Sequence, residues 1–124
     1  MVSGRRRSAF RSGSLAWFLQ RVTAVVLLAT LGFHFFWLHF VNHAATITLR
    51  GSALRMDRLG YAAVLVVFLV TAAFHGVNGI YNALVNRGLS GRPKQIVAWF
   101  LGIAGTVLVV QGIRVAVALA GVVA

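Results

Sequence analysis

Three long apolar runs, separated by shorter polar segments, form the pattern of this 124-residue chain. The runs extend over residues 15–40, 59–84 and 96–120. Each of them exceeds the roughly 20 mostly apolar residues that a helix needs to cross a bilayer. Because no segment outside the runs is long enough for a soluble domain, the pattern predicts an all-α protein with three transmembrane helices. Residues 1–124 are then a single membrane domain that begins with a basic arm, residues 1–14.

The polar segments between the runs indicate how the helices are connected. The second connection contains Gly88, Gly91 and Pro93, which is typical of a turn between antiparallel helices. The first connection, residues 41–58, is longer and amphiphilic, and the sequence leaves open whether it lies in the membrane interface. The first run is too long for the apolar part of a signal peptide, so we expect it to be a retained helix.

Charge and cysteine content exclude several classes of function. The net charge is +11 and Asp57 is the only carboxylate side chain, so paired carboxylates for acid–base catalysis are absent. With no cysteine, the chain forms no disulfide and holds no iron–sulfur cluster. The positive charge lies mostly in the segments that flank the runs, as the positive-inside rule describes, and this favours a membrane over a nucleic acid as the partner.

The distribution of this charge predicts an orientation. Basic residues precede the first run and occupy the second connection: Arg5, Arg6, Arg7, Arg11, Arg87, Arg92 and Lys94. The first connection is also basic, but Asp57 offsets part of its charge. The rule therefore predicts a multi-pass protein of the cell membrane with a cytoplasmic N-terminus.

Histidines are the main candidates for chemistry, and His75 is the foremost of them. It lies inside the second run, where an imidazole without a partner is costly and is therefore a candidate for function. Gly79 lies one helical turn away on the same face and leaves a flat space beside the ring, which suits a porphyrin. Neutral imidazole is the usual axial ligand of haem iron, and haem b needs no cysteine. The alternative is a structural imidazole that is hydrogen-bonded to a neighbouring helix.

Two further histidines, His34 and His39, lie in the first run. Their side chains face directions roughly 140° apart on a helix, so both cannot serve one iron from the same face. His34 is the deeper and preferred candidate, and His39 is the fallback ligand. At helical rise, His75 and His34 lie about 14 Å and about 28 Å from the cytoplasmic ends of their helices, which favours separate haems. A single haem that both residues ligate stays possible at this point.

Two segments of the chain resemble a known family. The first run contains WFLQRVTAV (residues 17–25) with His34 downstream, and the second run ends with HGVNGIYNALV (residues 75–85). In this order and spacing they resemble the membrane-anchor subunits of succinate dehydrogenase and fumarate reductase, the succinate:quinone oxidoreductases (complex II). The resemblance covers the first two runs and agrees with the three-helix count.

The resemblance implies a haem b-binding subunit that passes electrons from an iron–sulfur subunit to quinone, while a flavoprotein subunit oxidises succinate. His75 matches the ligand of the haem nearer the iron–sulfur subunit, and His34 matches the ligand of the distal haem in two-haem members. A second anchor subunit would complete both haem sites, so this chain is expected to be half of a haem-binding bundle. Arg21 matches an arginine near a haem propionate and the quinone pocket.

For the quinone site, the resemblance implies contacts from Ser14, Gln20, Arg21 and Arg87. Single-haem relatives carry a tyrosine where this chain has Asn86 and Arg87. Two-haem members use menaquinone, which is the quinone expected here, and the basic cytoplasmic segments are expected to dock the iron–sulfur subunit. Two alternatives stay open: an anchor with one haem on His75 and a structural His34, or a small non-redox membrane adaptor with structural histidines.

Overall fold

A computed structural model describes residues 14–41 and 43–121. The predicted basic arm, residues 1–14, lies outside the described residues except for Ser14. The elements in chain order are α1 (Leu15–Phe36), a π-helical segment (Trp37–Val41), a 3₁₀ turn (Ala44–Thr46), α2 (Leu49–Asp57), α3 (Leu59–Asn86) and α4 (Gly91–Gly121).

Three of the described helices are long and apolar enough to cross a membrane: Leu15–Val41, Leu59–Asn86 and Gly91–Gly121. This confirms the predicted all-α class with three transmembrane helices. The third helix begins at Gly91 rather than at residue 96, because its polar first turn contributes nothing to an apolar run. Pro93 is tolerated in that turn, since the first N–H groups of a helix have no partner within it.

Short polar motifs set the helix ends. The Ser14 hydroxyl caps α1 by accepting the backbone N–H of Trp17 at 3.2 Å, and the Thr48 hydroxyl caps α2 in the same way. Gly88 has φ of 105° and ends α3 in a Schellman motif, in which the N–H of Leu89 reaches the carbonyl of Leu84 at 3.1 Å. The chain can therefore reverse direction within a few residues and begin α4.

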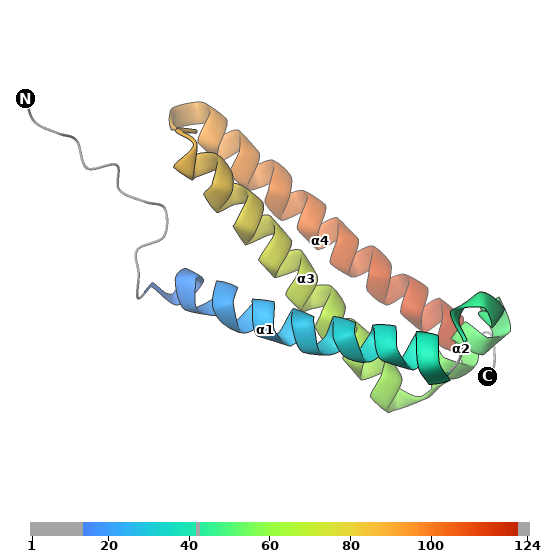
Figure 1. Cartoon of the computed structure of the whole chain (residues 1–124). Coiled ribbons are helices and arrows are strands. Elements are labelled where there is room, and N and C mark those ends of the chain that lie inside the picture. The colour runs from blue at the N-terminus through green and yellow to red at the C-terminus, as the bar shows by residue number, and fades with distance from the viewer. Residues whose placement is uncertain (1–13, 42, 122–124) are drawn as a thin grey trace, which may run out of the picture.

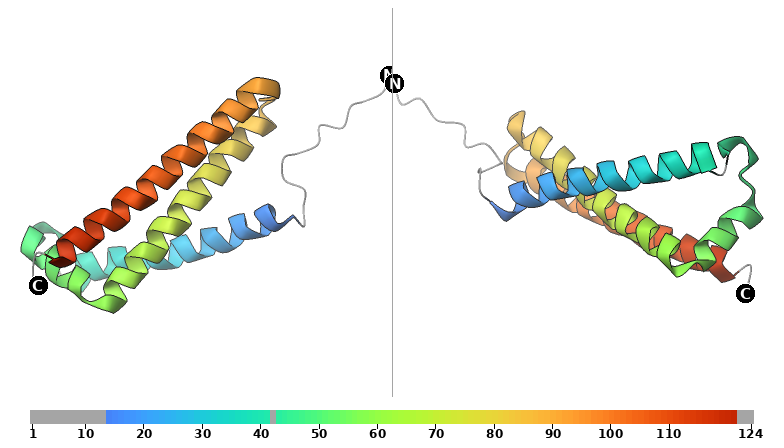
Figure 2. Two further views of the ribbon diagram at one scale, coloured as in Figure 1. Left: turned by 180° about the vertical axis from the view of Figure 1, so that it is seen from behind. Right: turned by 60° about the horizontal axis from the view of Figure 1, so that its bottom comes forward.

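Helix α3 is the centre of the bundle. Helices α1 and α4 both pack on α3, and the short α2 packs against α3 and α4. Figures 1 and 2 show α3 and α4 side by side and antiparallel, with α1 crossing α3. The start of α1 and the α3–α4 turn lie at one end of the bundle, here called the turn end, and α2 lies at the other, the α2 end (Figure 1).

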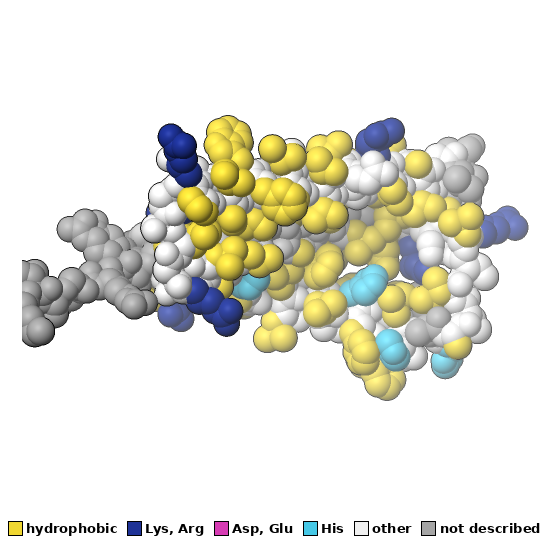
Figure 3. Space-filling view, turned by 90° about the horizontal axis from the view of Figure 1, so that it is seen from above, with side chains coloured by type: hydrophobic (Ala, Val, Ile, Leu, Met, Phe, Trp, Pro, Cys, Tyr) yellow, Lys and Arg dark blue, Asp and Glu magenta, His cyan; other side chains and the backbone are white. Residues whose placement is uncertain are grey.

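The outer surface of the bundle suits a lipid solvent. In Figure 3, hydrophobic side chains cover the middle of the molecule, and Lys and Arg side chains gather toward its two ends. Most large apolar side chains of the three long helices are exposed, and Ala53 is the only buried hydrophobic residue in the described part. In water such a surface would be unfavourable, so it has to be covered by lipid or by a protein partner.

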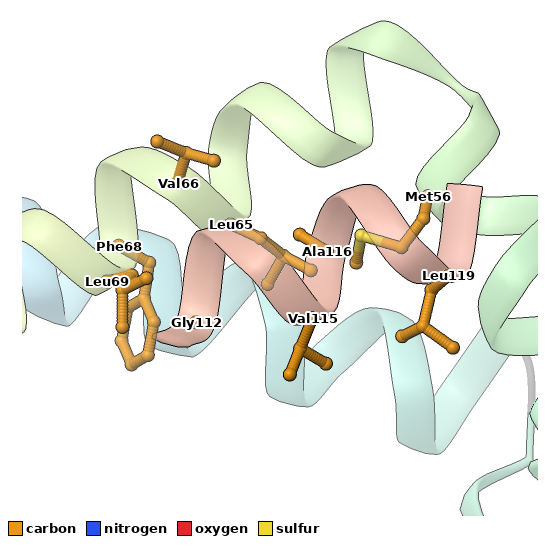
Figure 4. Close-up of a pocket in the computed structure, with 9 residues that line it drawn as sticks. All are labelled: Met56, Leu65, Val66, Phe68, Leu69, Gly112, Val115, Ala116 and Leu119. Atoms are coloured by element: carbon orange, nitrogen blue, oxygen red, sulfur yellow. The ribbon is translucent and has the colours of Figure 1, made fainter. Parts of the chain in front are cut away.

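Two glycines of α4 set how closely it approaches α3. A Cβ at Gly105 would lie 2.7 Å from Cγ2 of Val77, and a Cβ at Gly112 would overlap the side chain of Leu69. Small residues that allow such close backbone contact are a usual means of packing helices in membranes. Next to Gly112 the helices enclose an apolar cavity of about 260 Å³ (Figure 4), lined by Met56, Leu65, Val66, Phe68, Leu69, Gly112, Val115, Ala116 and Leu119.

We expect Gly105→Val to destabilise the protein, because Gly105 is buried and the new side chain would overlap Val77, whose branched side chain has few alternative rotamers. Overpacking of this kind costs about 1–3 kcal/mol. Thermal unfolding of the purified protein in detergent measures the effect as a lowered melting temperature. Gly102→Val is the matched control on the same helix, because no atom lies within 4 Å of a Cβ added there. Equal losses in both variants would contradict the close-contact explanation.

Candidate functional site

His75 lies between α3 and α1, and α1 side chains meet both nitrogens of its ring. Its Nδ1 lies 3.0 Å from the Thr23 hydroxyl, and its Nε2 lies 3.3 Å from the amide nitrogen of Gln20. The same Gln20 amide donates to the backbone carbonyl of His75 at 3.2 Å. The imidazole is half-buried, so these contacts satisfy a polar group that lipid cannot.

The hydrogen bonds of Thr23 determine which nitrogen of His75 carries the hydrogen. The Thr23 hydroxyl lies 2.7 Å from the backbone carbonyl of Leu19, to which it donates its single hydrogen. Toward His75 the hydroxyl must therefore accept, so Nδ1 carries the hydrogen and Nε2 carries a lone pair. The Gln20 amide then donates to that lone pair. This neutral tautomer is one in which imidazole binds a metal.

The polar contacts continue from Gln20 along α3. The amide of Asn78 donates to Oε1 of Gln20 at 2.7 Å, and the amide of Asn82 donates to the backbone and side-chain oxygens of Asn78 at 2.6 and 3.0 Å. Asn82 is 6% exposed and is the buried polar residue of the described part. Sequence reasoning missed Thr23, Asn78 and Asn82 as site residues. The spacing of residues 75, 78 and 82 on one helix face was the available signal.

The sequence predicts a flat space beside His75 at Gly79, and in the structure the Gln20 amide occupies this place. A Cβ at Gly79 would lie 3.2 Å from the amide nitrogen of Gln20. A larger residue at position 79 would push this side chain away. A metal at Nε2 of His75 requires the Gln20 amide to turn aside, which a side chain with three rotatable bonds can do.

His34 lies at the α2 end, also between helices. Its Nδ1 is 3.4 Å from the Tyr61 hydroxyl of α3, with the two ring centroids 6.4 Å apart. His34 contacts α3 at Tyr61, whereas His75 is itself a residue of α3. Positions 61 and 75 are about 21 Å apart at helical rise. This separation excludes a single haem iron ligated by both histidines of the chain, the possibility that the sequence left open.

The remaining histidines lie outside the helix contacts. His39 is exposed in the π-helical segment, where its Nδ1 lies 3.1 Å from the carbonyl of Phe35 and its ring stacks on Phe35 at 4.0 Å. His43 is exposed in the first connection. In the described part, no three side chains of His, Cys, Asp or Glu gather into a metal site. A metal at His34 or His75 would therefore need most of its ligands from elsewhere, as a porphyrin supplies them.

The structure separates the quinone-site candidates. Gln20 lies at His75. Arg21 is exposed and its guanidinium lies 4.2 Å from the centre of the Trp17 ring, a cation–π contact. The Ser14 hydroxyl caps α1, and Arg87 is exposed at the end of α3. Of the four, only Gln20 contacts His75 in this chain, and the other three lie toward the turn end.

Comparison with known proteins gives a family for most of the chain. Residues 3–113 match the family described as succinate dehydrogenase/fumarate reductase transmembrane subunit. The matched range includes α1, α2, α3, both inward-facing histidines and most of α4. No curated protein and no solved structure gives a significant match.

Proposed function

Because the chain belongs to the succinate dehydrogenase/fumarate reductase transmembrane subunit family, and is thus a membrane anchor subunit of a succinate:quinone oxidoreductase, we propose that it binds haem b and conducts electrons from the iron–sulfur subunit to quinone. The observation that carries this proposal is the state of His75. Its Nδ1 meets the Thr23 hydroxyl, and its Nε2 faces the Gln20 amide that lies beside Gly79.

The residues at His75 fit a haem. Nε2 is a ligand atom of the right chemistry, and Gly79 leaves a recess that a Cβ would fill. The occupant of this recess, the Gln20 amide, is flexible. The Thr23 hydroxyl on the far nitrogen is the outer partner that a ligating histidine usually has, because it fixes the tautomer and raises the basicity of the ligand.

When bound, haem b supplies a one-electron carrier. The tasks of this chain are to hold the ring of His75 at a fixed depth, to keep its Nδ1 hydrogen on Thr23, and to exclude water with apolar side chains. His34 would serve a second haem nearer the α2 end. In the described part of the chain no three metal-ligating side chains gather at either histidine, so any further protein ligand of a haem held there would come from the partner anchor subunit.

The turn end is assigned to quinone and to the electron donor. Arg21 is exposed there, and a guanidinium suits a haem propionate or a quinone oxygen. Ser14, Gln20 and Arg87 complete the proposed quinone contacts, with menaquinone as the substrate. The basic residues of the α3–α4 turn support a cytoplasmic turn end that docks the iron–sulfur subunit.

Two alternatives rest on specific contacts. Both nitrogens of His75 have partners within the chain, as a structural histidine in a non-redox adaptor would. At His34, the Tyr61 hydroxyl can donate a hydrogen bond to Nδ1. The ring hydrogen of His34 would then be on Nε2, which leaves no lone pair there for a metal. In that case His34 is structural and the chain is a one-haem anchor.

Loss of individual histidines tests the proposal. In the purified complex, we expect His75→Ala to remove one haem b α-band and His34→Ala to remove the other. His39→Ala is the control and should leave both, since its ring lies outside the helix contacts. Reduced-minus-oxidised spectra and haem-to-protein stoichiometry measure the outcome.

Each other result selects an alternative. A colourless wild-type complex supports the adaptor. A wild-type content of one haem that His34→Ala does not change supports the one-haem anchor. Loss of haem in His39→Ala but not in His34→Ala shows that the ligand assignment is wrong.

Thr23→Val tests the role of the hydroxyl. The variant leaves Nδ1 without its acceptor, so the ligand becomes less basic, ferric iron is stabilised less, and the midpoint potential of the His75 haem should rise. Loss of such an outer partner typically weakens metal binding by roughly 10–100-fold, so haem retention should also fall. Redox titration of the α-band measures the shift.

The chain offers matched controls for this variant. Thr30→Val removes a hydroxyl of α1 that also donates to a backbone carbonyl, at 2.8 Å, but lies at another depth. Thr23→Ser keeps the acceptor and should restore the wild-type potential. If Thr23→Val and Thr30→Val behave alike, Thr23 does not orient the ligand.

A further inference from the structure

A second cavity, with polar groups in its lining, lies at the α2 end next to His34. Its volume is about 210 Å³. Segments from α1 through α3 line it: His34, Leu38, Ile47, Ser52, Arg55, Met56, Tyr61 and Leu65. Imidazole, hydroxyl and guanidinium groups therefore share a small space with apolar side chains.

Arg55 is the charged group of this cavity, and its own helix gives it no counter-charge. The guanidinium is half-buried and donates to the neutral Ser52 hydroxyl at 3.1 Å. Asp57 is the only carboxylate side chain of the protein, is exposed, and lies two positions further along α2, about 200° around the helix. A partly desolvated guanidinium is stabilised by an anion, which it binds best through paired hydrogen bonds.

The position of Arg55 is built into the fold. Ala53 is fully buried and pins α2 to the bundle, and the Thr48 cap orders its first turn. The neighbouring Arg50 and Arg58 are exposed and reach water, whereas Arg55 lines the cavity. One of three arginines in this connection is thus held toward the interior.

The α2-end cavity has an apolar neighbour. Met56 and Leu65 line both it and the apolar cavity of about 260 Å³ between α3 and α4 (Figure 4). A ligand whose head lies beside Arg55 therefore has hydrocarbon-lined space next to it. At about 210 Å³, the α2-end cavity itself holds a headgroup and only a few further atoms.

We propose that the α2-end cavity binds the acidic headgroup of an amphiphile. Arg55 pairs with a carboxylate or phosphate, the hydroxyls of Ser52 and Tyr61 donate to it, and the apolar body lies against Met56 and Leu65. Two sources share this chemistry. One is the propionate of a haem held by His34, which rests on the proposed function, and the other is the phosphate of an anionic phospholipid, which does not.

Arg55→Gln in the purified complex tests the site, with Arg58→Gln as the exposed control on the same segment. One measurement is the midpoint potential, at two pH values, of the haem that His34→Ala removes. The other is native mass spectrometry of the delipidated complex after addition of phosphatidylglycerol or phosphatidylcholine, which counts bound lipid.

If the headgroup is a haem propionate, Arg55→Gln lowers that midpoint potential and makes it more pH-dependent, because a nearby cation that favours the reduced haem is lost. If it is a phosphate, wild type retains phosphatidylglycerol in preference to phosphatidylcholine, Arg55→Gln loses most of this retention, and the potential is unchanged. Arg55→Lys keeps the charge and should give an intermediate result in either case, so it also covers a failure of Arg55→Gln to assemble.

Indistinguishable potentials and lipid retention in Arg55→Gln and Arg58→Gln would overturn the proposal. A complex that has no His34-dependent haem would refute the second haem of the proposed function. The lipid measurement alone would then test whether the α2-end cavity binds an acidic headgroup.

Discussion

The hydrogen bond between the His75 ring and the Thr23 hydroxyl joins α1 to α3 where lipid offers no polar partner. Inside a bilayer each polar group has to be satisfied by protein, so a histidine on α3 requires polar residues on the helix that crosses it. Gln20 and Thr23 meet that requirement with opposite hydrogen-bonding roles. The crossing of α1 and α3 and the tautomer of His75 are thus consequences of one set of contacts.

The same constraint explains why the polar residues form a connected series. The carboxamide of Gln20 uses its nitrogen on His75 and its oxygen on Asn78, which in turn accepts from Asn82. A single unsatisfied amide at this depth would cost more than its hydrogen bond returns, so the series is stable only when complete. A haem that displaces the Gln20 amide must compensate for the contacts of this one side chain, while Thr23 can keep its own.

The two ends of the bundle differ in what they present. The turn end carries exposed Arg21 and Arg87, available to a partner or to headgroups. The α2 end holds half-buried Arg55 beside His34 in the lining of one cavity. His34 contacts α3 at Tyr61, whereas His75 lies near the middle of α3, so the two histidines lie at different depths. The outer helix faces are apolar and exposed, which suits contact with lipid or with another subunit.

The sequence by itself determined the number of membrane helices and the family, and it singled out His75 as a candidate, because run length and the cost of a polar group in lipid do not depend on tertiary detail. It did not reveal that Gln20 and Thr23 meet His75, that Tyr61 meets His34, or that Arg55 faces a cavity. A helix that is apolar on every side has almost the same hydropathy in any rotation about its axis, so sequence cannot say which face meets which neighbour. The crossing of α1 over α3 decides the contacts of His75 and His34. The formation of α2 in the first connection, whose structure the sequence left open, decides the position of Arg55.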